Sequence, residues 1–530
     1  MQAELILFGG RIYTMDQALP LATAVAVRNG RIVAVGDEAD IRDLSGPETE
    51  QINLGGCIAL PGFTDAHLHL VDYGLSLTGV QLDGLDSSAK VVSAVAERAR
   101  HTSPGEWIRG YGWNRNLWPG APFPTRHELD RLTPDNPVYL LSKDMHSGWA
   151  NSVALQAAGL DRHVPDPPGG QFLREADGGE LTGVLKERAM EAMAKVAGPF
   201  SEEELVPAVL CAVHSLHRMG VAGVHTPERA SGLSGLQAVW LRGELTLRVN
   251  VMIPAEDLAH ARGMGLAGGF GDEYLRLLAV KAYSDGALGS RTADMFQPYE
   301  TEPENRGIEV TGSDCLSKLI EECSAAGWGI AVHAIGDRAN CRVLDALEEH
   351  WSEWSPRGIR PRIEHVQLIS PQDVPRLGAM GVIACMQPIH CTSDMLMAEE
   401  HWGARCSGAY AWRSVLDGGA RLAFGSDAPV EEPDVLRGIY AAVTRTREDG
   451  TPAGGWYSEQ CLTVPEAMYA YTLGAAYASG EERVKGSIAV GKQADMVVLS
   501  QDIFQGHPED LLTTEVEATI VAGETVFRAA

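Results

Sequence analysis

The chain has 530 residues, 45% of them hydrophobic, and a formal net charge of −28. This length allows two or three domains, and this charge repels phosphate backbones and anionic lipids, so we expect neither nucleic acid nor a membrane as a partner. Nine cysteines without a C-x-x-C pair, no long apolar run and no basic, apolar leader favour a cytoplasmic protein with reduced thiols.

Short β-strands are predicted at both ends of the chain. They cover residues 4–8, 24–29, 31–36, 487–499 and 517–527. The Asn29-Gly30 pair predicts a hairpin turn, and the C-terminal strands are punctuated by glycine. We therefore expect residues 1–58 and 484–530 to form one composite β-sandwich.

Between these ends, residues 59–483 alternate apolar strands with helical stretches, which indicates βαβ units and a parallel sheet. Each apolar strand ends in polar residues, at Asp65, His225, Lys281, His333, His365, Gln387 and Asp427. The fold class predicted here is α/β, a (β/α)8 barrel. In such a barrel, side chains at the carboxyl ends of the strands converge on one site.

Residues 72–198 are predicted to be an insertion, because His69 and Lys281 are too far apart for three βα units. An insertion after the first strand leaves the barrel at its carboxyl end, where barrel active sites lie. We interpret it as a lid or substrate-binding subdomain, with a purely structural embellishment as the alternative. Trp113 and Trp118 are candidates to line an aromatic pocket, although large aromatic residues in an insertion more often form its core.

His67 and His69 form an H-x-H pair at the end of an apolar run. Alternate residues of a strand point to the same side, so both imidazoles can bind one metal ion. An isolated H-x-H pair is weak evidence for a metal site. Here His333, His365 and Asp427 also follow apolar strands, which makes coincidence a poor explanation.

Lys281 closes an apolar strand, where desolvation favours the neutral amine. A neutral amine can react with carbon dioxide to give a carbamate, whose two oxygens are able to bridge two metal ions. The alternative is a buried lysine paired with Asp285 or with a substrate carboxylate. The residues alone do not separate these two possibilities.

Six motifs occur in a characteristic order: PGFTDAHLH, VKAYSDGALGSRTA, AVHAIGDRAN, RIEHVQL, MQPIH and GSDAPV. Together they resemble the amidohydrolase superfamily, and more closely its YtcJ-like branch, which includes N-substituted formamide deformylases. RIVAVG and KGSIAVGKQADMVVL resemble the terminal sandwich of that superfamily. The resemblance covers nearly the whole chain and is specific for fold and metal site, but not for substrate.

The resemblance implies two divalent metal ions, with zinc as the expected metal, although some relatives use one. His67, His69 and Asp427 would bind one ion, and His333 and His365 the other. Lys281, N-carboxylated by carbon dioxide, would bridge them.

The implied function is hydrolysis of a C–N bond in a small-molecule amide, such as an N-substituted formamide, by a metal-activated water. Asp427 is the expected general base, which takes the proton of water and returns it to the leaving nitrogen. By resemblance, His390, His146 and Arg291 contact the substrate, and Trp113 is a further candidate.

Two other functions remain open at this point. One is deamination of a heterocycle, although superfamily members with that activity usually lack a lysine at a strand end. The other is a metal-holding regulator without catalysis. By resemblance to the family, a homodimer is expected.

Overall fold

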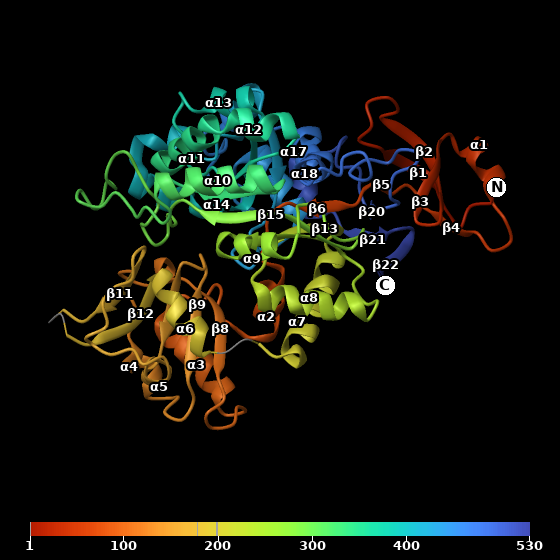
Figure 1. The fold of residues 1–530 in the computed structure, drawn as a ribbon. Coiled ribbons are helices and arrows are strands. Elements are labelled where there is room, and N and C mark those ends of the chain that lie inside the picture. Colours follow the sequence, from red (N-terminus) through yellow and green to blue (C-terminus); the bar gives the residue numbers. More distant parts are fainter. Residues whose placement is uncertain (1, 177–178, 198–199, 530) are drawn as a thin grey trace.

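The computed structural model describes residues 2–176, 179–197 and 200–529. The predicted boundaries at residues 1, 198 and 530 therefore lie outside the described residues. Within these ranges the strands form three sheets. In Figure 1 the central sheet and its helices lie between a sheet built from both chain ends and a separate inserted part below.

The central sheet has eight strands, and every neighbouring pair in it is parallel. In chain order its strands are β6 (Phe63–Asp65), β13 (Val221–Pro227), β14 (Arg248–Pro254), β15 (Leu275–Tyr283), β16 (Gly329–Ala334), β17 (Arg362–His365), β18 (Ile383–Met386) and β19 (Arg421–Phe424). The backbone N–H of Ala66 donates to the carbonyl of Phe424 at 2.9 Å, next to the ends of β6 and β19. The predicted parallel barrel is therefore confirmed as a nearly closed eight-stranded sheet.

Buried strands and amphipathic helices make up the barrel wall. All of β16 except its first residue is buried, as expected for a parallel sheet covered on both faces. The covering helices include α7 (Glu202–Arg218), α8 (Ala230–Leu241), α10 (Ser313–Ala326), α11 (Asp337–Glu349), α14 (Pro388–Trp402) and α16 (Val435–Thr444). The start of α7 is fixed by a capping box between Ser201 and Glu204.

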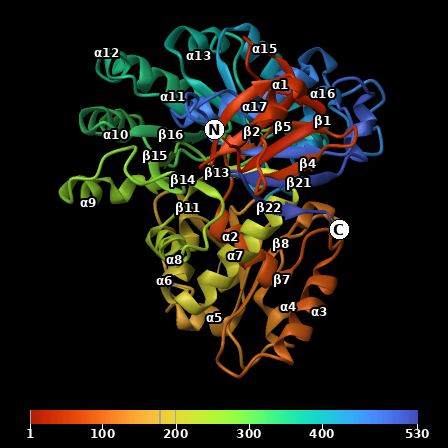
Figure 2. The same cartoon turned by 90° about the vertical axis from the view of Figure 1, so that its right-hand side faces the viewer.

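Strands from both chain ends share the second sheet, seen at the front of Figure 2. It contains β1 (Leu5–Tyr13), β2 (Leu21–Arg28), β3 (Arg31–Gly36), β4 (Glu50–Asn53), β5 (Ile58–Pro61), β20 (Met496–Leu499), β21 (Val516–Val521) and β22 (Glu524–Arg528). Strand β20 pairs with β5 on one side and β21 on the other. Ile12, Val27, Met496 and Ile520 lie in one buried cluster, so apolar contacts also join the ends. The division into two packed layers, with boundaries at 58 and 484, stays a prediction.

The third sheet lies in the inserted segment and has the order β11-β12-β10-β9-β8-β7. Its strands are β7 (Val80–Gln81), β8 (Ile108–Trp113), β9 (Val138–Ser142), β10 (Ser147–Ala150), β11 (Gly170–Arg174) and β12 (Leu181–Glu187). The sheet begins later than the predicted insertion, because residues 72–78 belong to α2 (Leu70–Thr78), which packs against α7. At this contact a Cβ on Gly74 would lie 2.1 Å from the carbonyl oxygen of Ala208, so only glycine permits the approach.

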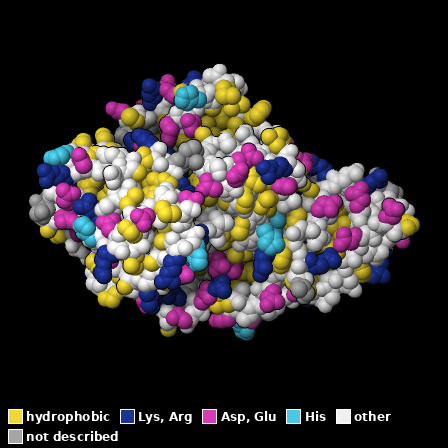
Figure 3. Space-filling view, turned by 90° about the horizontal axis from the view of Figure 1, so that it is seen from below, with side chains coloured by type: hydrophobic (Ala, Val, Ile, Leu, Met, Phe, Trp, Pro, Cys, Tyr) yellow, Lys and Arg dark blue, Asp and Glu magenta, His cyan; other side chains and the backbone are white. Residues whose placement is uncertain are grey.

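The surface carries mixed charge. Figure 3 shows acidic, basic and apolar side chains interspersed over the face seen from below. Among the helices of the described ranges, none combines the length and the apolar character needed to cross a membrane.

Candidate metal centre

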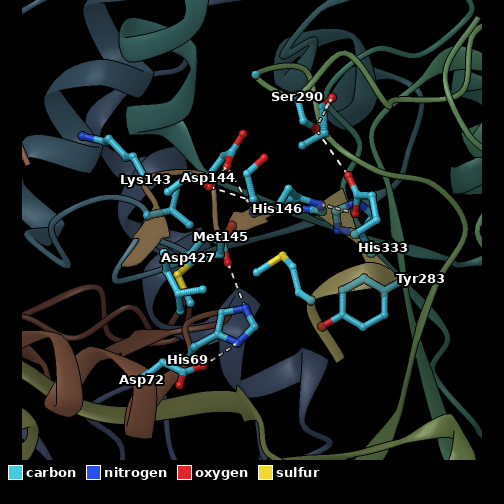
Figure 4. A pocket seen from close by; sticks show the side chains of 18 of the residues that line it. His69, Asp72, Lys143, Asp144, Met145, His146, Tyr283, Ser290, His333 and Asp427 are labelled. Carbon is cyan, nitrogen blue, oxygen red and sulfur yellow. Dashed lines mark hydrogen bonds and ion pairs between the residues drawn. The ribbon is translucent and has the colours of Figure 1, made fainter. Parts of the chain in front are cut away.

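A cavity of about 1580 Å³ opens at the carboxyl ends of the barrel strands. Its lining comes from both the barrel and the inserted segment. All six predicted metal ligands line it: His67, His69, Lys281, His333, His365 and Asp427. Figure 4 shows His69, Asp427, His146 and His333 facing this pocket. The structure therefore brings together residues that are up to 360 positions apart, from His67 to Asp427.

Asp427 lies among the imidazoles. Its Oδ1 is 3.4 Å from Nε2 of His67 and 3.4 Å from Nε2 of His69. Its Oδ2 is 4.0 Å from Nδ1 of His365 and 3.4 Å from Nε2 of His390. Burial alone raises the pKa of Asp427, but the hydrogen bond with His390 and the proximity of the other imidazoles hold it well below its usual range. The carboxylate is therefore ionised, which is the form that binds a metal ion.

Buried charges set the orientation of His67. Its Nδ1 lies 2.5 Å from Oε2 of Glu364, which leaves Nε2 directed at Asp427. Glu364 is in turn bound by Arg362, whose Nε donates to Oε1 at 2.5 Å. Burial raises the pKa of Glu364, but the charge of Arg362 and the contact with His67 hold it well below its usual range. A carboxylate behind a histidine fixes the ring orientation in many metal sites.

Lys281 is buried at the end of β15. Its Nζ has no hydrogen-bond partner among the described residues and lies 4.9 Å from the centre of the Tyr283 ring. Burial lowers its pKa to about 8, which increases the share of neutral amine near neutral pH.

Asp285 does not pair with Lys281, which removes one alternative for this lysine. The Asp285 carboxylate instead accepts hydrogen bonds from the backbone N–H groups of Asp294, Ile335 and Gly336, at 2.8–3.0 Å. These bonds join the loops after β15 and β16, so the role of Asp285 is to hold the rim of the cavity.

His333 and His365 are neighbours, with ring centres 4.6 Å apart. Nε2 of His333 is bound to the carbonyl of Gly286 at 3.0 Å, and Nδ1 of His365 to Oε1 of Gln387 at 2.9 Å. Each ring therefore keeps its other nitrogen for a further partner. Burial lowers the pKa of both imidazoles well below the usual value, so both are neutral, the form that coordinates metals.

Two of these side chains stand on strained backbone. His365 has a φ of 74° and Asp427 a φ of 62°, in the left-handed region that side chains other than glycine rarely adopt. Such strain persists where surrounding contacts determine it and is concentrated at functional sites. Asp65 supplies part of that restraint, because its carboxylate accepts from the backbone N–H groups of His67 and Ser426.

The predicted substrate residues His390 and His146 also reach the cavity. Burial lowers the pKa of His390, but hydrogen bonds with Asp427 and Glu431 raise it to about 10. Nδ1 of His146 lies 2.8 Å from Oε2 of Glu187. That carboxylate outweighs burial and raises the pKa of His146 to about 9. Both rings are therefore protonated at neutral pH and can donate hydrogen bonds.

The other predicted substrate residues divide into two groups. Arg291 lines the cavity and pairs with Glu302 at 2.6 Å. Trp113 borders the cavity but is only 2% exposed, because it packs in the core of the inserted sheet. Trp118 belongs to the same core and does not line the cavity, which agrees with the favoured alternative that large aromatic residues form the core of the insertion. Inserted strands need an apolar core of their own, and these indoles fill it.

Two groups of side chains could hold a metal ion among the residues that the structure describes. In the first, the ligand atoms of His67, His365 and Asp427 lie within 4.8 Å of one another. The second combines His67 with Glu364 and Cys385, but Arg362 donates to both of the latter. The first group is therefore the better candidate. The assignment of each imidazole to one of two ions stays a prediction.

Three carboxylates of the site were not predicted from the sequence: Glu187, Glu364 and Glu431. Each lies within 3.7 Å of a histidine of the cavity. Glu364 carried one signal, since it follows Arg362 by two residues in a buried strand, which places both on one face. The pairs involving Glu187 and Glu431 arise from the tertiary arrangement.

Comparisons with known proteins agree with this geometry. The model of the amidohydrolase family matches residues 50–527. YtcJ of Bacillus subtilis, which its name assigns to the amidohydrolases, is 34% identical over 98% of each chain. The N-substituted formamide deformylase of Arthrobacter pascens is 27% identical, over 98% of this chain and 97% of its own. An uncharacterized metal-dependent hydrolase from Pyrococcus horikoshii superposes with a TM-score of 0.78 and 28% identity, over 95% and 99% of the two chains. These matches confirm the predicted resemblance.

Proposed function

Because the chain belongs to the amidohydrolase family and is thus a metal-dependent hydrolase, we propose that it hydrolyses the C–N bond of a small-molecule amide. An N-substituted formamide is the first candidate, supported by similarity to the deformylase over nearly the whole chain. The observation that carries the proposal is the convergence of the buried His67 and His365 and the half-buried His69 on the ionised Asp427.

The side chains present fit a metal centre. Nε2 of His67, Oδ1 of Asp427 and Nζ of Lys281 are buried atoms without a hydrogen-bond partner in the described ranges. Unpaired buried polar atoms are costly, and they persist where an ion or another group completes them. All three belong to residues that the sequence marks as ligands.

We assign His67, His69 and Asp427 to one ion and His333 and His365 to a second, with zinc as the expected metal. Lys281 would complete this ligand set, since its neutral Nζ can add to carbon dioxide with loss of a proton and give a carbamate whose oxygens would hold metal. When bound, divalent ions of this kind polarise the substrate carbonyl and make a water molecule acidic.

The chain's own residues would then move the protons. Asp427 accepts the proton of the attacking water and passes it to the leaving nitrogen, because its low pKa keeps it ionised until that step. His390, 3.4 Å from Asp427 and protonated, donates to the oxygen on which negative charge develops. Glu364 keeps His67 in one orientation throughout.

The inserted segment, predicted as residues 72–198, would form the substrate-binding part of the cavity. It supplies His146, which reaches the neighbourhood of His333 with ring centres 5.5 Å apart. The composite sandwich of residues 1–58 and 484–530 would support the barrel 59–483 from outside.

A screen tests the proposal. Protein loaded with zinc or manganese is incubated with N-formyl amines, N-acyl amines, lactams and amino-substituted heterocycles, and amine and acid products are measured. We expect amine release from an acyclic amide, and its loss in Asp427→Asn. Ammonia release from heterocycles alone would replace amide hydrolysis by deamination as the function.

A further inference from the structure

A cluster of cations lies beside the same cavity; Arg115 and Arg291 line the cavity, and Lys186 packs next to Arg115 without lining it. Arg115 and Lys186 belong to the inserted segment, and both are buried, with 9% and 8% exposure. The guanidinium carbon of Arg115 lies 4.0 Å, and Nζ of Lys186 4.5 Å, from the centre of the Phe123 ring. Arg291 stands nearby, since its charge acts on both cations. We call Arg115, Lys186 and Arg291 the cationic cluster.

Arg115 and Lys186 have no ion-pair partner in the part of the chain that the structure describes. One N–H of Arg115 donates to the carbonyl of Ala121 at 2.6 Å, and Nζ of Lys186 lies 3.5 Å from the carbonyl of Ser290. Burial and the neighbouring arginines lower the pKa of Lys186 to about 8. Two buried cations without a counter-ion are unfavourable, and a bound anion would relieve that cost.

The carboxylates closest to the cluster already have partners. Glu302 pairs with Arg291 at 2.6 Å, and Glu187 pairs with His146 at 2.8 Å. Asp144 accepts only from neutral donors, a hydroxyl and a backbone N–H of its own turn, so its charge acts on Arg115 and Lys186 and offsets one of these two cations. The cluster therefore keeps excess positive charge, in a protein whose net charge is −28.

Several side chains separate the cluster from the metal ligands. His146 contacts His333 on one side and Glu187 on the other. Glu187 in turn accepts from Ser290 at 3.3 Å, and Ser290 directly precedes Arg291. Arg291, Arg115 and Phe123 all line the cavity. A molecule that reaches the metal centre with one end can thus present its other end to the cluster.

We propose that the cationic cluster binds a carboxylate at the end of the substrate remote from the bond that is cleaved. This proposal rests on the function proposed above and narrows its substrate class to amides that also carry a carboxylate. The planar guanidinium fork of Arg115 matches a carboxylate in shape and charge. Phe123, beside it, offers an apolar surface to the chain between the two ends.

The test measures binding of inert ketones, so that it does not depend on turnover. The probes are 5-oxohexanoate, 7-oxooctanoate and 9-oxodecanoate, each paired with the ω-hydroxy ketone of the same length. Calorimetry on zinc-loaded protein compares the wild type with Arg115→Gln. Arg229→Gln serves as the control, because Arg229 is an exposed arginine of the cavity lining whose charge acts on Asp72.

For at least one chain length, the wild type should bind the keto acid about tenfold or more tightly than the hydroxy ketone of the same length. A difference of this size is expected for a charge-assisted hydrogen bond. Arg115→Gln should remove that preference and Arg229→Gln should retain it. If Arg115→Gln does not fold, Arg291→Gln replaces it, since it removes the ion-pair partner of Glu302 beside the cluster and should weaken the same preference. A preference that survives in Arg115→Gln overturns the proposal, because the carboxylate would then bind elsewhere, for example at the metal.

The absence of any preference in the wild type also overturns it. The two proposals can fail separately. Amide hydrolysis without a carboxylate preference leaves the metal-centre proposal standing and removes the cationic cluster as a binding site. If the protein hydrolyses none of the screened amides but shows a preference that depends on Arg115, the cationic cluster stands as a binding site and the proposed amide hydrolysis does not.

Discussion

Oε2 of Glu364 lies 2.5 Å from Nδ1 of His67, in the interior of the barrel. This contact holds the ring so that its other nitrogen faces Asp427, 3.4 Å away. Glu364→Gln keeps the size of the side chain but removes its charge. We expect metal affinity to fall about 10–100-fold, the usual effect of losing a partner behind a metal ligand.

Competition with a chromogenic chelator measures that affinity. Glu244→Gln, at an exposed position of the described chain, is the matched control. The variant also leaves Arg362 without its buried partner, so folded protein is verified by circular dichroism before titration. Unchanged affinity in folded Glu364→Gln would show that this carboxylate does not orient a ligand.

Because Lys281 is buried, we predict that the stability of the metal-free protein rises with pH above pH 8. The pKa of Lys281 is lowered from 10.5 to about 8 on folding, so the unfolded chain binds more protons between these values. Burying the charged Lys281 therefore lowers the free energy of unfolding by its full amount below pH 8. This penalty shrinks as the pH rises above 8 and the folded protein loses the proton. Relative to Lys281→Met, the wild type should gain about 1–2 kcal/mol between pH 8 and pH 9.5.

Urea unfolding at each pH measures this difference, and subtracting the Lys281→Met data removes the titration of other groups. A flat difference between the two proteins would mean that Lys281 is not desolvated as the structure shows. In addition, bicarbonate during zinc loading should raise the metal content of the wild type but not of the variant.

At the point where the barrel closes, we predict that only glycine fits at position 425. A Cβ on this residue would lie 2.5 Å from the backbone nitrogen of His67 and 2.6 Å from Oδ1 of Asp65. Because those atoms are fixed, Gly425→Ala should cost about 1–3 kcal/mol by overpacking and should also weaken metal binding. Gly263→Ala meets no atom within 4 Å and is the control. Equal stability of the two variants, measured by thermal unfolding, would contradict the close packing described here.

We predict that Asp427→Asn loses the transfer of the proton from water to the leaving nitrogen. The amide resembles the carboxylate in shape but cannot accept the proton of water, so kcat should fall about 10²–10⁴-fold. Steady-state kinetics on any amide found in the screen give the value, and metal analysis of the same sample separates lost chemistry from lost metal. Residual activity close to wild type would assign the base to another residue.

The sequence predicted the barrel because the signal for each strand is local. Apolar runs ending at His333, His365 and Asp427 mark strand ends, and the barrel brings such ends to one edge. This rule marked His67, His69, His333, His365 and Asp427 as candidate ligands, whereas Lys281 was assigned as a ligand only by resemblance to the family. The inserted sheet was located only coarsely, since α2 continues into the predicted segment before β7 begins.

The partners of these residues could not be predicted in the same way. Glu187 reaches His146 only because two strands of the inserted sheet place them together, and Glu431 reaches His390 from a different loop. No local pattern marks such pairs. The choice between pocket and core for Trp118 also needed the structure, because composition shows an aromatic residue but not which side of a sheet it packs against.

A crystal structure of zinc-loaded protein, with anomalous data at the zinc edge, tests most directly whether these side chains bind metal together. We expect anomalous density bounded by His67, His69, His333, His365 and Asp427, with extra density on Nζ of Lys281. Zinc located instead among His67, Glu364 and Cys385, or no zinc within the cavity, would contradict it.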